Sequence, residues 1–578
     1  MDYSSLVSME QSVKQTMRLA KDTIQQNPSK FVVVSVLNLV ILGYFLYIYT
    51  TSFTAAVPKI QHFSSRKITL NSIEKSRKKW NHTYGKWLNY LPDFQTAVIA
   101  IDKIPYFPSV NETTSPNNSF ITIQKMPYFV GDLLEAVITS KNYWNQTKQY
   151  GGDLFQVILY RKPADDILIP CKITDNHNGL YDVTCPLVSE GDFELKAKLR
   201  FSSELLYLFM LNHQTKMGVN IYVTSEYMNS SSPAEHSRCA VGFDEPVDNE
   251  LCNYTNPTNG EPWFCIKPPS RECNPISSQQ KIHLKGTDMK KGEIPLNFMK
   301  KYYKETNQYG AEISLSGIKF KVLKKIKKKK INFLSKENCY DTFKNTMKQV
   351  DPLISGWLQN KNWHSMRCEN MPIELEALFK CLEGCDVYFF GDSVIRKWYI
   401  CFKKHQFKEY LGIKNSWSIS RDAISEHFNV SLHYRSHGPP LHSDGPPTAR
   451  PYISDSLDAI SEKEKSVVII SLGAHYFSTS ADIFLERILV IKKAIRRLLA
   501  RSPKSRVFMK GIHTIGGVST RWLFYRMEQI LKHEFQNEKD VTLLDVWELS
   551  VLMNNTNIHP HDDVLFQQIG LFQSYLCR

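Results

Sequence analysis

The 578-residue chain carries two different patterns of hydrophobic and polar positions. Between about residues 115 and 225, short runs of alternating apolar and polar residues are separated by turn signals such as Asn178-Gly179 and Gly151-Gly152-Asp153. This pattern predicts a β-sandwich. In the C-terminal half, short apolar runs rich in β-branched residues are separated by helical or polar stretches such as residues 482–501. That pattern predicts parallel β-α-β units.

One strand-to-helix junction carries the strongest chemical signal. An apolar strand ends in Gly391-Asp392-Ser393, and an amphipathic helix begins at once. The small Gly391 allows a tight turn, and the start of the helix directs backbone N–H groups at the oxyanion that forms when Ser393 attacks an acyl carbon. The alternative is an ordinary turn in which Ser393 caps the helix.

A histidine far downstream completes the predicted pair. His559 lies in a polar loop just before the last predicted helix, residues 563–576. In a doubly wound fold this loop returns to the carboxyl edge of the sheet. Ser393 and His559 therefore predict acyl transfer, with a serine nucleophile and a histidine general base.

Residues 31–50 contain no charged side chain, and this length matches the hydrocarbon thickness of a bilayer. We expect an uncleaved transmembrane signal anchor behind a cytoplasmic tail, residues 1–30, with cleavage near Ala56 as the alternative. All twelve cysteines and the Asn-x-Ser/Thr acceptors follow this segment, which predicts that the bulk of the chain is lumenal. The predicted glycosylation sites are Asn81, Asn111, Asn117, Asn145, Asn229, Asn253, Asn429 and Asn554.

The changes of pattern divide the lumenal part into four predicted regions. Residues 51–110 form a stem, residues 111–230 the sandwich, residues 231–335 a Cys-rich and basic linker, and residues 336–578 the α/β domain. A chain of this length can bury more than one core, so two folded domains are expected beyond the membrane segment.

The cysteines of the N-terminal half are predicted to form disulfides. Cys171 and Cys185 flank one hairpin of the sandwich. Four more lie in a segment rich in Pro, Asn and Gly, where cross-links would replace a missing core, namely Cys239, Cys252, Cys265 and Cys273. Zinc is the competing reading, but no Cys-x-x-Cys occurs there, and we predict no metal.

The formal charge of +15 does not indicate a nucleic-acid partner. Residues 319–330 alone contain eight lysines and no acid. A lumenal chain does not meet DNA, and no recognition motif accompanies the run. The run reads as a solvated segment that joins the domains, or as a patch that attracts anionic glycans.

An ordered set of motifs resembles a known family, the neurexophilin and PC-esterase domain (NXPE) family, whose C-terminal half is similar to the GDSL/SGNH hydrolases. The set is Gly391-Asp392-Ser393, residues 435–440, Asp545-Val546-Trp547, residues 557–560 and residues 574–577. The resemblance implies an SGNH-like doubly wound parallel sheet. The remaining half would be an immunoglobulin- or filamin-like sandwich of the neurexophilin type.

Carried over residue by residue, the resemblance makes Ser393 the nucleophile, Gly438 an oxyanion donor and His559 the base. Two positions depart from it. His475 stands where the superfamily has an oxyanion-binding asparagine, so an imidazole would have to donate. Thr556 stands where the superfamily has the aspartate that orients the histidine. Asp545, at the end of the preceding strand, is an upstream carboxylate that could take its place.

The resemblance implies a Golgi or secretory-pathway O-acyltransferase or esterase that acts on a glycan. By similarity, the acceptor would be a sialic acid or another sugar hydroxyl, and the acyl donor acetyl-coenzyme A, although no phosphate-binding glycine motif supports that donor. The alternative is a catalytically inactive glycoprotein that binds a cell-surface receptor. A carboxylate at the distal nitrogen of His559 would favour the enzyme, and its absence would favour the binding protein.

Overall fold

The computed structural model describes most of the chain after residue 85. The described ranges are residues 86–104, 109–123, 127–214, 221–229, 232–240, 250–257, 260–273, 276–284, 310–324, 337–344, 353–411, 420–438, 451–462, 465–476, 481–516 and 518–578. All of them belong to one compact unit, residues 68–578. The predicted membrane anchor at residues 31–50 and the acceptor Asn81 lie outside the described residues. Within these ranges, no helix is both long enough and apolar enough to cross a bilayer.

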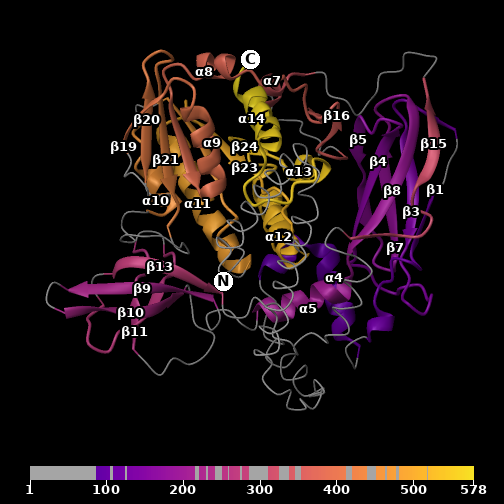
Figure 1. Cartoon of the computed structure of the whole chain (residues 1–578), viewed down its shortest axis with the longest axis horizontal. Coiled ribbons are helices and arrows are strands. Elements are labelled where there is room, and N and C mark those ends of the chain that lie inside the picture. Colours follow the sequence, from indigo (N-terminus) through magenta and orange to yellow (C-terminus); the bar gives the residue numbers. More distant parts are fainter. Residues whose placement is uncertain are drawn as a thin grey trace, which may run out of the picture. The chain divides into compact units, whose positions relative to one another are not determined.

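Two β-sheets, most of whose strands lie between residues 120 and 201, share one apolar core (Figure 1). The first has the order β1-β3-β7-β6, with β1 (Phe120–Ile123), β3 (Leu133–Thr139), β7 (Leu180–Pro186) and β6 (Lys172–Asp175). The second has the order β17-β16-β5-β4-β8-β15-β2, with β17 (Asn362–Ser365), β16 (Gly356–Gln359), β5 (Ile167–Pro170), β4 (Leu154–Lys162), β8 (Gly191–Phe201), β15 (Ile318–Leu323) and β2 (Tyr128–Phe129), and β14 (Ala311–Glu312) pairs with β8. Every pairing is antiparallel except β15 with β2.

The first half of the lysine-rich run is part of this second sheet. In β15, Phe320 and Val322 point into the core, whereas Lys319 and Lys321 are exposed. Alternation with period two places the apolar side chains on one face of a strand, so a segment rich in lysine still pairs with β8.

The C-terminal half is built on a seven-stranded sheet in the order β19-β20-β21-β18-β22-β23-β24. Its strands are β19 (Lys408–Leu411), β20 (Arg421–Ser425), β21 (Val430–Ser436), β18 (Asp386–Gly391), β22 (Ser466–Ser471), β23 (Arg506–Lys510) and β24 (Val541–Leu544). The strands from β21 to β24 are parallel, and β19 and β20 are antiparallel. Because β18 comes first in the chain but lies inside the sheet, the strand order switches at β18, which is where ligands bind in such sheets.

Helices cover both faces of this sheet (Figure 1). All six residues of β22 are buried, as expected for a strand that packs against helices on both sides. One face shares a core with α8 (Leu375–Cys381), α9 (Ser393–Lys403), α13 (Trp547–Leu552) and α14 (Asp562–Leu576). The other shares a core with α10 (Ile453–Asp458), α11 (Ala481–Arg501) and α12 (Val518–Phe535).

The segment that precedes the sandwich packs on the second of these cores. It contains η2 (Lys86–Tyr90), α4 (Pro92–Asp102) and η3 (Val110–Glu112), and α5 (Ser203–Gln214) contacts α4. Trp87 donates its backbone N–H to Asp482 of α11 at 2.9 Å, and the rings of Phe94 and Trp522 are 5.0 Å apart. The described part of the predicted stem is therefore a packed component of the α/β domain.

The Cys-rich segment forms a five-stranded antiparallel sheet in the order β11-β12-β10-β9-β13. Its strands are β9 (Ile221–Asn229), β10 (Ser232–Ala240), β11 (Leu251–Asn253), β12 (Phe264–Ile266) and β13 (Ile276–Leu284). Its apolar cluster is small and consists mainly of Tyr227, Trp263, Ile276 and half-cystines. The disulfides Cys239–Cys265 and Cys252–Cys273 supply stability that so small an apolar cluster does not provide.

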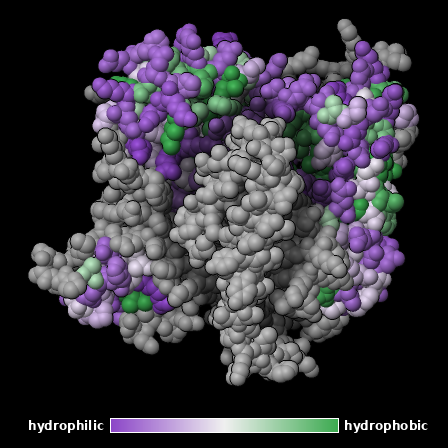
Figure 2. All heavy atoms as spheres, in the orientation of Figure 1, coloured by the Kyte–Doolittle hydropathy of each residue, from purple (hydrophilic) through white to green (hydrophobic). Residues whose placement is uncertain are grey.

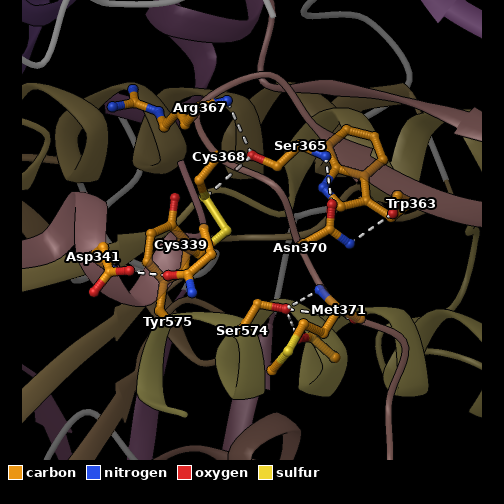
Figure 3. Close-up of a disulfide and its surroundings, with 12 residues drawn as sticks. Cys339, Asp341, Trp363, Ser365, Arg367, Cys368, Asn370, Met371, Ser574 and Tyr575 are labelled. Carbon is orange, nitrogen blue, oxygen red and sulfur yellow. Dashed lines mark hydrogen bonds between the residues drawn. A yellow bond between two sulfur atoms is a disulfide. The ribbon is translucent and has the colours of Figure 1, made fainter. Parts of the chain in front are cut away.

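Five disulfides hold the described chain together, namely Cys171–Cys185, Cys239–Cys265, Cys252–Cys273, Cys339–Cys368 and Cys381–Cys577. Figure 3 shows the fourth, which joins α7 (Cys339–Lys344) to the segment after β17. Beside it, Ser574 of α14 donates its hydroxyl to the carbonyl of Gly570 and accepts the backbone N–H of Met371 at 2.9 Å. Cys385 and Cys401 are free thiols.

The described surface in the view of Figure 2 is mostly hydrophilic, with scattered apolar side chains. Five disulfides and a polar exterior are typical of a protein of the secretory pathway or the extracellular space.

Candidate active site

The strand-to-helix turn of residues 391–393, called the nucleophile turn below, lies at the carboxyl end of β18. Gly391 has a φ of 144°, and a Cβ atom at this position would lie 1.8 Å from the carbonyl oxygen of Ser471. Only glycine fits so close to the neighbouring strand. Gly391 is level with Ser436 on β21 and Ser471 on β22, so the loops that follow all three strands meet at one edge.

Asp392 fixes this turn from two directions. As the N-cap of α9, it accepts the backbone N–H of Val394 at 2.9 Å, and its second oxygen accepts the backbone N–H of Ala474 at 2.8 Å. Asp392 is fully buried, and the nearby ammonium of Lys510 is buried as well. Burial lowers the pKa of Lys510 to about 8, and the negative charge of Asp392 opposes that shift.

Ser393 and His559 meet although 166 residues separate them. Ser393 Oγ lies 2.7 Å from His559 Nε2, so the hydroxyl can donate to the ring. Partial burial lowers the pKa of His559, the cations of Arg396 and Lys397 lower it further, and only the carboxylate of Asp392 raises it. The ring is therefore held in the neutral form that a general base requires, with its proton on Nδ1.

The structure does not bring Asp545 to His559. Asp545 follows β24, three strands from β18 or about 14 Å across the sheet, and pairs with Lys532 at 2.9 Å. The backbone carbonyl of Thr556 accepts the N–H of Gly516 at 2.7 Å. Within the part of the chain that the structure describes, no carboxylate lies within 4.0 Å of a ring nitrogen of His559.

Two backbone amides lie at or beside the turn that carries Ser393. His437 donates its backbone N–H to the carbonyl of Gly391 at 3.1 Å, which holds Gly438 beside the nucleophile turn. The amides of Ser393 and Gly438 donate to no acceptor among the described residues. Unused N–H groups at a helix N-terminus and in an adjacent loop can stabilise a developing negative charge.

His475 is held by a second histidine that the sequence interpretation missed. His437 Nδ1 lies 2.6 Å from the carbonyl oxygen of Gly438, and His437 Nε2 lies 2.8 Å from His475 Nδ1. A carbonyl only accepts, so His437 Nδ1 carries the proton and its Nε2 must accept from His475. Burial holds the pKa of His437 well below its usual range, and His475 adds to this effect. A neutral His475 therefore presents Nε2 as an acceptor and donates there only when it is protonated.

Two buried side chains, His513 and Asn555, hold the backbone of the loop that carries His559. His513 Nε2 donates to the carbonyl of Ile558 at 2.9 Å. Asn555 donates to the carbonyls of Thr514 at 2.6 Å and Asn557 at 2.9 Å. These bonds connect the loop to the segment after β23 and fix the backbone on one side of His559.

The predicted glycosylation sites lie on the surface wherever their side chains are described. The exposed acceptors are Asn111, Asn117, Asn145, Asn253, Asn429 and Asn554. Asn229 ends β9. No group of three or more His, Cys, Asp or Glu side chains among the described residues is arranged to hold a metal ion.

The parallel sheet, the turn at Ser393 and the facing His559 belong to one mixed α/β domain. Residues 363–577 match the family model described as "NXPE family member 4-like, C-terminal domain". That part of the chain is therefore similar to the C-terminal domain of the NXPE family.

Two solved structures are similar to parts of the chain. A GDSL-like lipase from Parabacteroides merdae has 9% sequence identity, covers 34% of this chain and 97% of its own, and gives a TM-score of 0.23. An active-site mutant of a family two carbohydrate esterase from Clostridium thermocellum has 13% identity, covers 36% of this chain and 63% of its own, and gives a TM-score of 0.18. Both scores are below 0.5, so neither likeness carries an argument about this chain.

Proposed function

We propose that this protein is a secretory-pathway O-acyltransferase or esterase that modifies a glycan through an acyl-enzyme on Ser393. One observation carries the proposal, the 2.7 Å contact between Ser393 Oγ and His559 Nε2 at the N-terminus of α9. A hydroxyl, a neutral imidazole and unused amide N–H groups are the parts that acyl transfer requires.

In the first half-reaction, His559 Nε2 takes the hydroxyl proton of Ser393 as Oγ attacks the acyl carbon of the donor. The oxyanion accepts from the amides of Ser393 and Gly438. When the tetrahedral intermediate collapses, the bond to the leaving group breaks, and His559 returns the proton to that group. The acyl group remains as an ester of Ser393.

In the second half-reaction, His559 takes a proton from the acceptor, whose oxygen attacks the ester carbonyl. Collapse releases the acylated acceptor, and His559 returns the proton to Ser393 Oγ. A sugar hydroxyl as acceptor gives transfer, and water gives hydrolysis. Resemblance to the family supports a sialic acid hydroxyl as the acceptor and acetyl-coenzyme A as the donor of the acyl group. The five disulfides support a lumenal site of action, for which we propose the Golgi membrane.

Cells that lack sialic-acid O-acetylation test this function. They would express the wild type, Ser393→Ala or His559→Ala, and released sialic acids would be measured by mass spectrometry. We expect O-acetyl content to rise with the wild type alone, since neither the nucleophile nor the base can be replaced by the remaining groups. Equal O-acetyl content in all three cell lines would reject a role in sialic-acid acetylation.

One observation favours a second candidate, a non-enzymatic glycoprotein that binds a cell-surface receptor. Within the described residues, His559 lacks the carboxylate that orients the histidine of a triad. Thr556→Asp separates the candidates. If the protein is an enzyme that the missing carboxylate weakens, this substitution should raise the rate of acyl transfer or hydrolysis. A wild type without either activity, together with an inert Thr556→Asp variant, would leave the binding function.

A further inference from the structure

One lysine joins the helix of the nucleophile to the loop of the base. Lys397 lies four residues after Ser393 on α9, which places both side chains on one face of the helix. Its Nζ donates to the carbonyl of Pro560, the residue after His559, and forms an ion pair with Asp562 at 2.9 Å. A single side chain thus fixes the loop that carries the base against the helix that carries the nucleophile.

This contact completes the support of His559. His513 holds the carbonyl of Ile558 on one side, and Lys397 holds the carbonyl of Pro560 on the other. The backbone is therefore held immediately before and immediately after the base. Pro560 is buried and has a fixed φ, which further limits the movement of the loop.

We propose that Lys397 is the positioning residue of this site, which holds His559 toward Ser393 in place of the orienting carboxylate. The proposal rests on the proposed function, because positioning matters only if Ser393 reacts. Lys397 contacts the backbone and not the imidazole, so it does not touch the reacting atoms.

A cation near His559, where a catalytic triad has a carboxylate, affects the pKa of the imidazole. A carboxylate beside His559 would favour the imidazolium and raise the pKa of the ring. Partial burial lowers the pKa of His559, the carboxylate of Asp392 raises it, and the cations of Arg396 and Lys397 add to the lowering. His559 thus remains neutral, and able to act as a base, at a more acidic pH than a triad histidine.

The test compares full-length wild type, Lys397→Met, Lys397→Arg and Lys403→Met. Lys403→Met is the matched control, because Lys403 lies on the same helix with similar exposure and pairs with Glu409 at 3.0 Å, away from the loop. The rate at which a fluorophosphonate labels Ser393 would be measured against pH, together with hydrogen exchange of a peptide that covers residues 555–562.

We expect Lys397→Met to label about tenfold to a hundredfold more slowly at its optimum, as misplaced catalytic groups do. Its pH midpoint should rise, since a cation near His559 is lost, and its loop should exchange faster. Lys397→Arg should recover part of the rate, and Lys403→Met should match the wild type. Wild-type rate and midpoint in Lys397→Met would overturn the proposal.

Failure of the proposed function is a separate outcome. If the wild type is not labelled at Ser393, that function falls, and the exchange of the 555–562 loop decides on Lys397 alone. Faster exchange in Lys397→Met than in Lys403→Met would show that Lys397 holds the loop, and equal exchange would refute that contact.

Discussion

The carboxylate of Asp392 accepts the backbone N–H of Ala474 at 2.8 Å while its other oxygen caps the helix that begins with Ser393. The turn that presents the nucleophile and the loop that presents His475 are therefore held by one buried side chain. This contact makes the carboxyl edge of β18 and β22 a single rigid unit.

Asp392→Asn should destabilise the α/β domain and slow the labelling of Ser393. An amide has only one accepting oxygen, and its NH2 group would face a backbone N–H, so one buried bond is lost at a cost of about 1–3 kcal/mol. Thermal unfolding and fluorophosphonate labelling would be measured beside Asp540→Asn, which changes an exposed carboxylate. Unchanged unfolding and labelling in Asp392→Asn would show that the two contacts contribute little.

His475→Asn should preserve or increase the reactivity of Ser393. An amide donates at every pH, whereas neutral His475, with its Nδ1 proton committed to His437, offers a lone pair at Nε2. If the amide reaches the oxyanion, the labelling rate should rise by roughly tenfold or more. A loss of labelling in a folded His475→Asn variant would instead assign His475 an indispensable role as it stands.

The pH dependence of labelling should reflect the lowered pKa of His559. The base must be neutral, so the rate should rise with pH through the pKa of His559 and then level off. Partial burial and two cations place that midpoint below the ordinary value for histidine, about 6.5. A midpoint above 6.5 would contradict this electrostatic description of the site.

Cys577→Ser should weaken the domain and reduce the amount of folded protein in cells. The Cys381–Cys577 disulfide joins residues 196 positions apart, and in the chain-entropy model a loop of that length contributes about 5 kcal/mol. Cys401→Ser is the matched control, because Cys401 is a partly buried free thiol. The amount of full-length protein in cells and its unfolding temperature would be measured, and equal values for the two variants would argue against this contribution.

Local signals in the sequence were enough to predict the strand-to-helix turn at Ser393 and the loop that carries His559. An apolar strand, a glycine and the start of a helix stand together at Ser393, and a polar loop before the last helix marks His559. The partners of these residues could not be predicted in the same way. Ala474 is 82 residues from Asp392, and their contact exists because β18 and β22 are neighbours in the sheet.

The distance along the sequence did not indicate which side chain lies close to His559 and its loop. Asp545 precedes His559 by only 14 residues, yet it ends the outermost parallel strand and neutralises Lys532. Lys397 is 163 residues from Pro560 and still contacts it. Position in the sheet, which depends on strand order, decides which side chains meet at the edge.

If His559 activates Ser393 as a nucleophile, a fluorophosphonate should form a covalent adduct on Ser393. Mapping that adduct by mass spectrometry is the most direct test. Full-length wild type, Ser393→Ala and His559→Ala would be treated with a fluorophosphonate, and the modified peptide would be identified by mass spectrometry. We expect an adduct on Ser393 in the wild type, no adduct at that position in Ser393→Ala, and greatly slowed labelling in a folded His559→Ala. An unlabelled Ser393 in the folded wild type, or labelling as fast in His559→Ala, would contradict it.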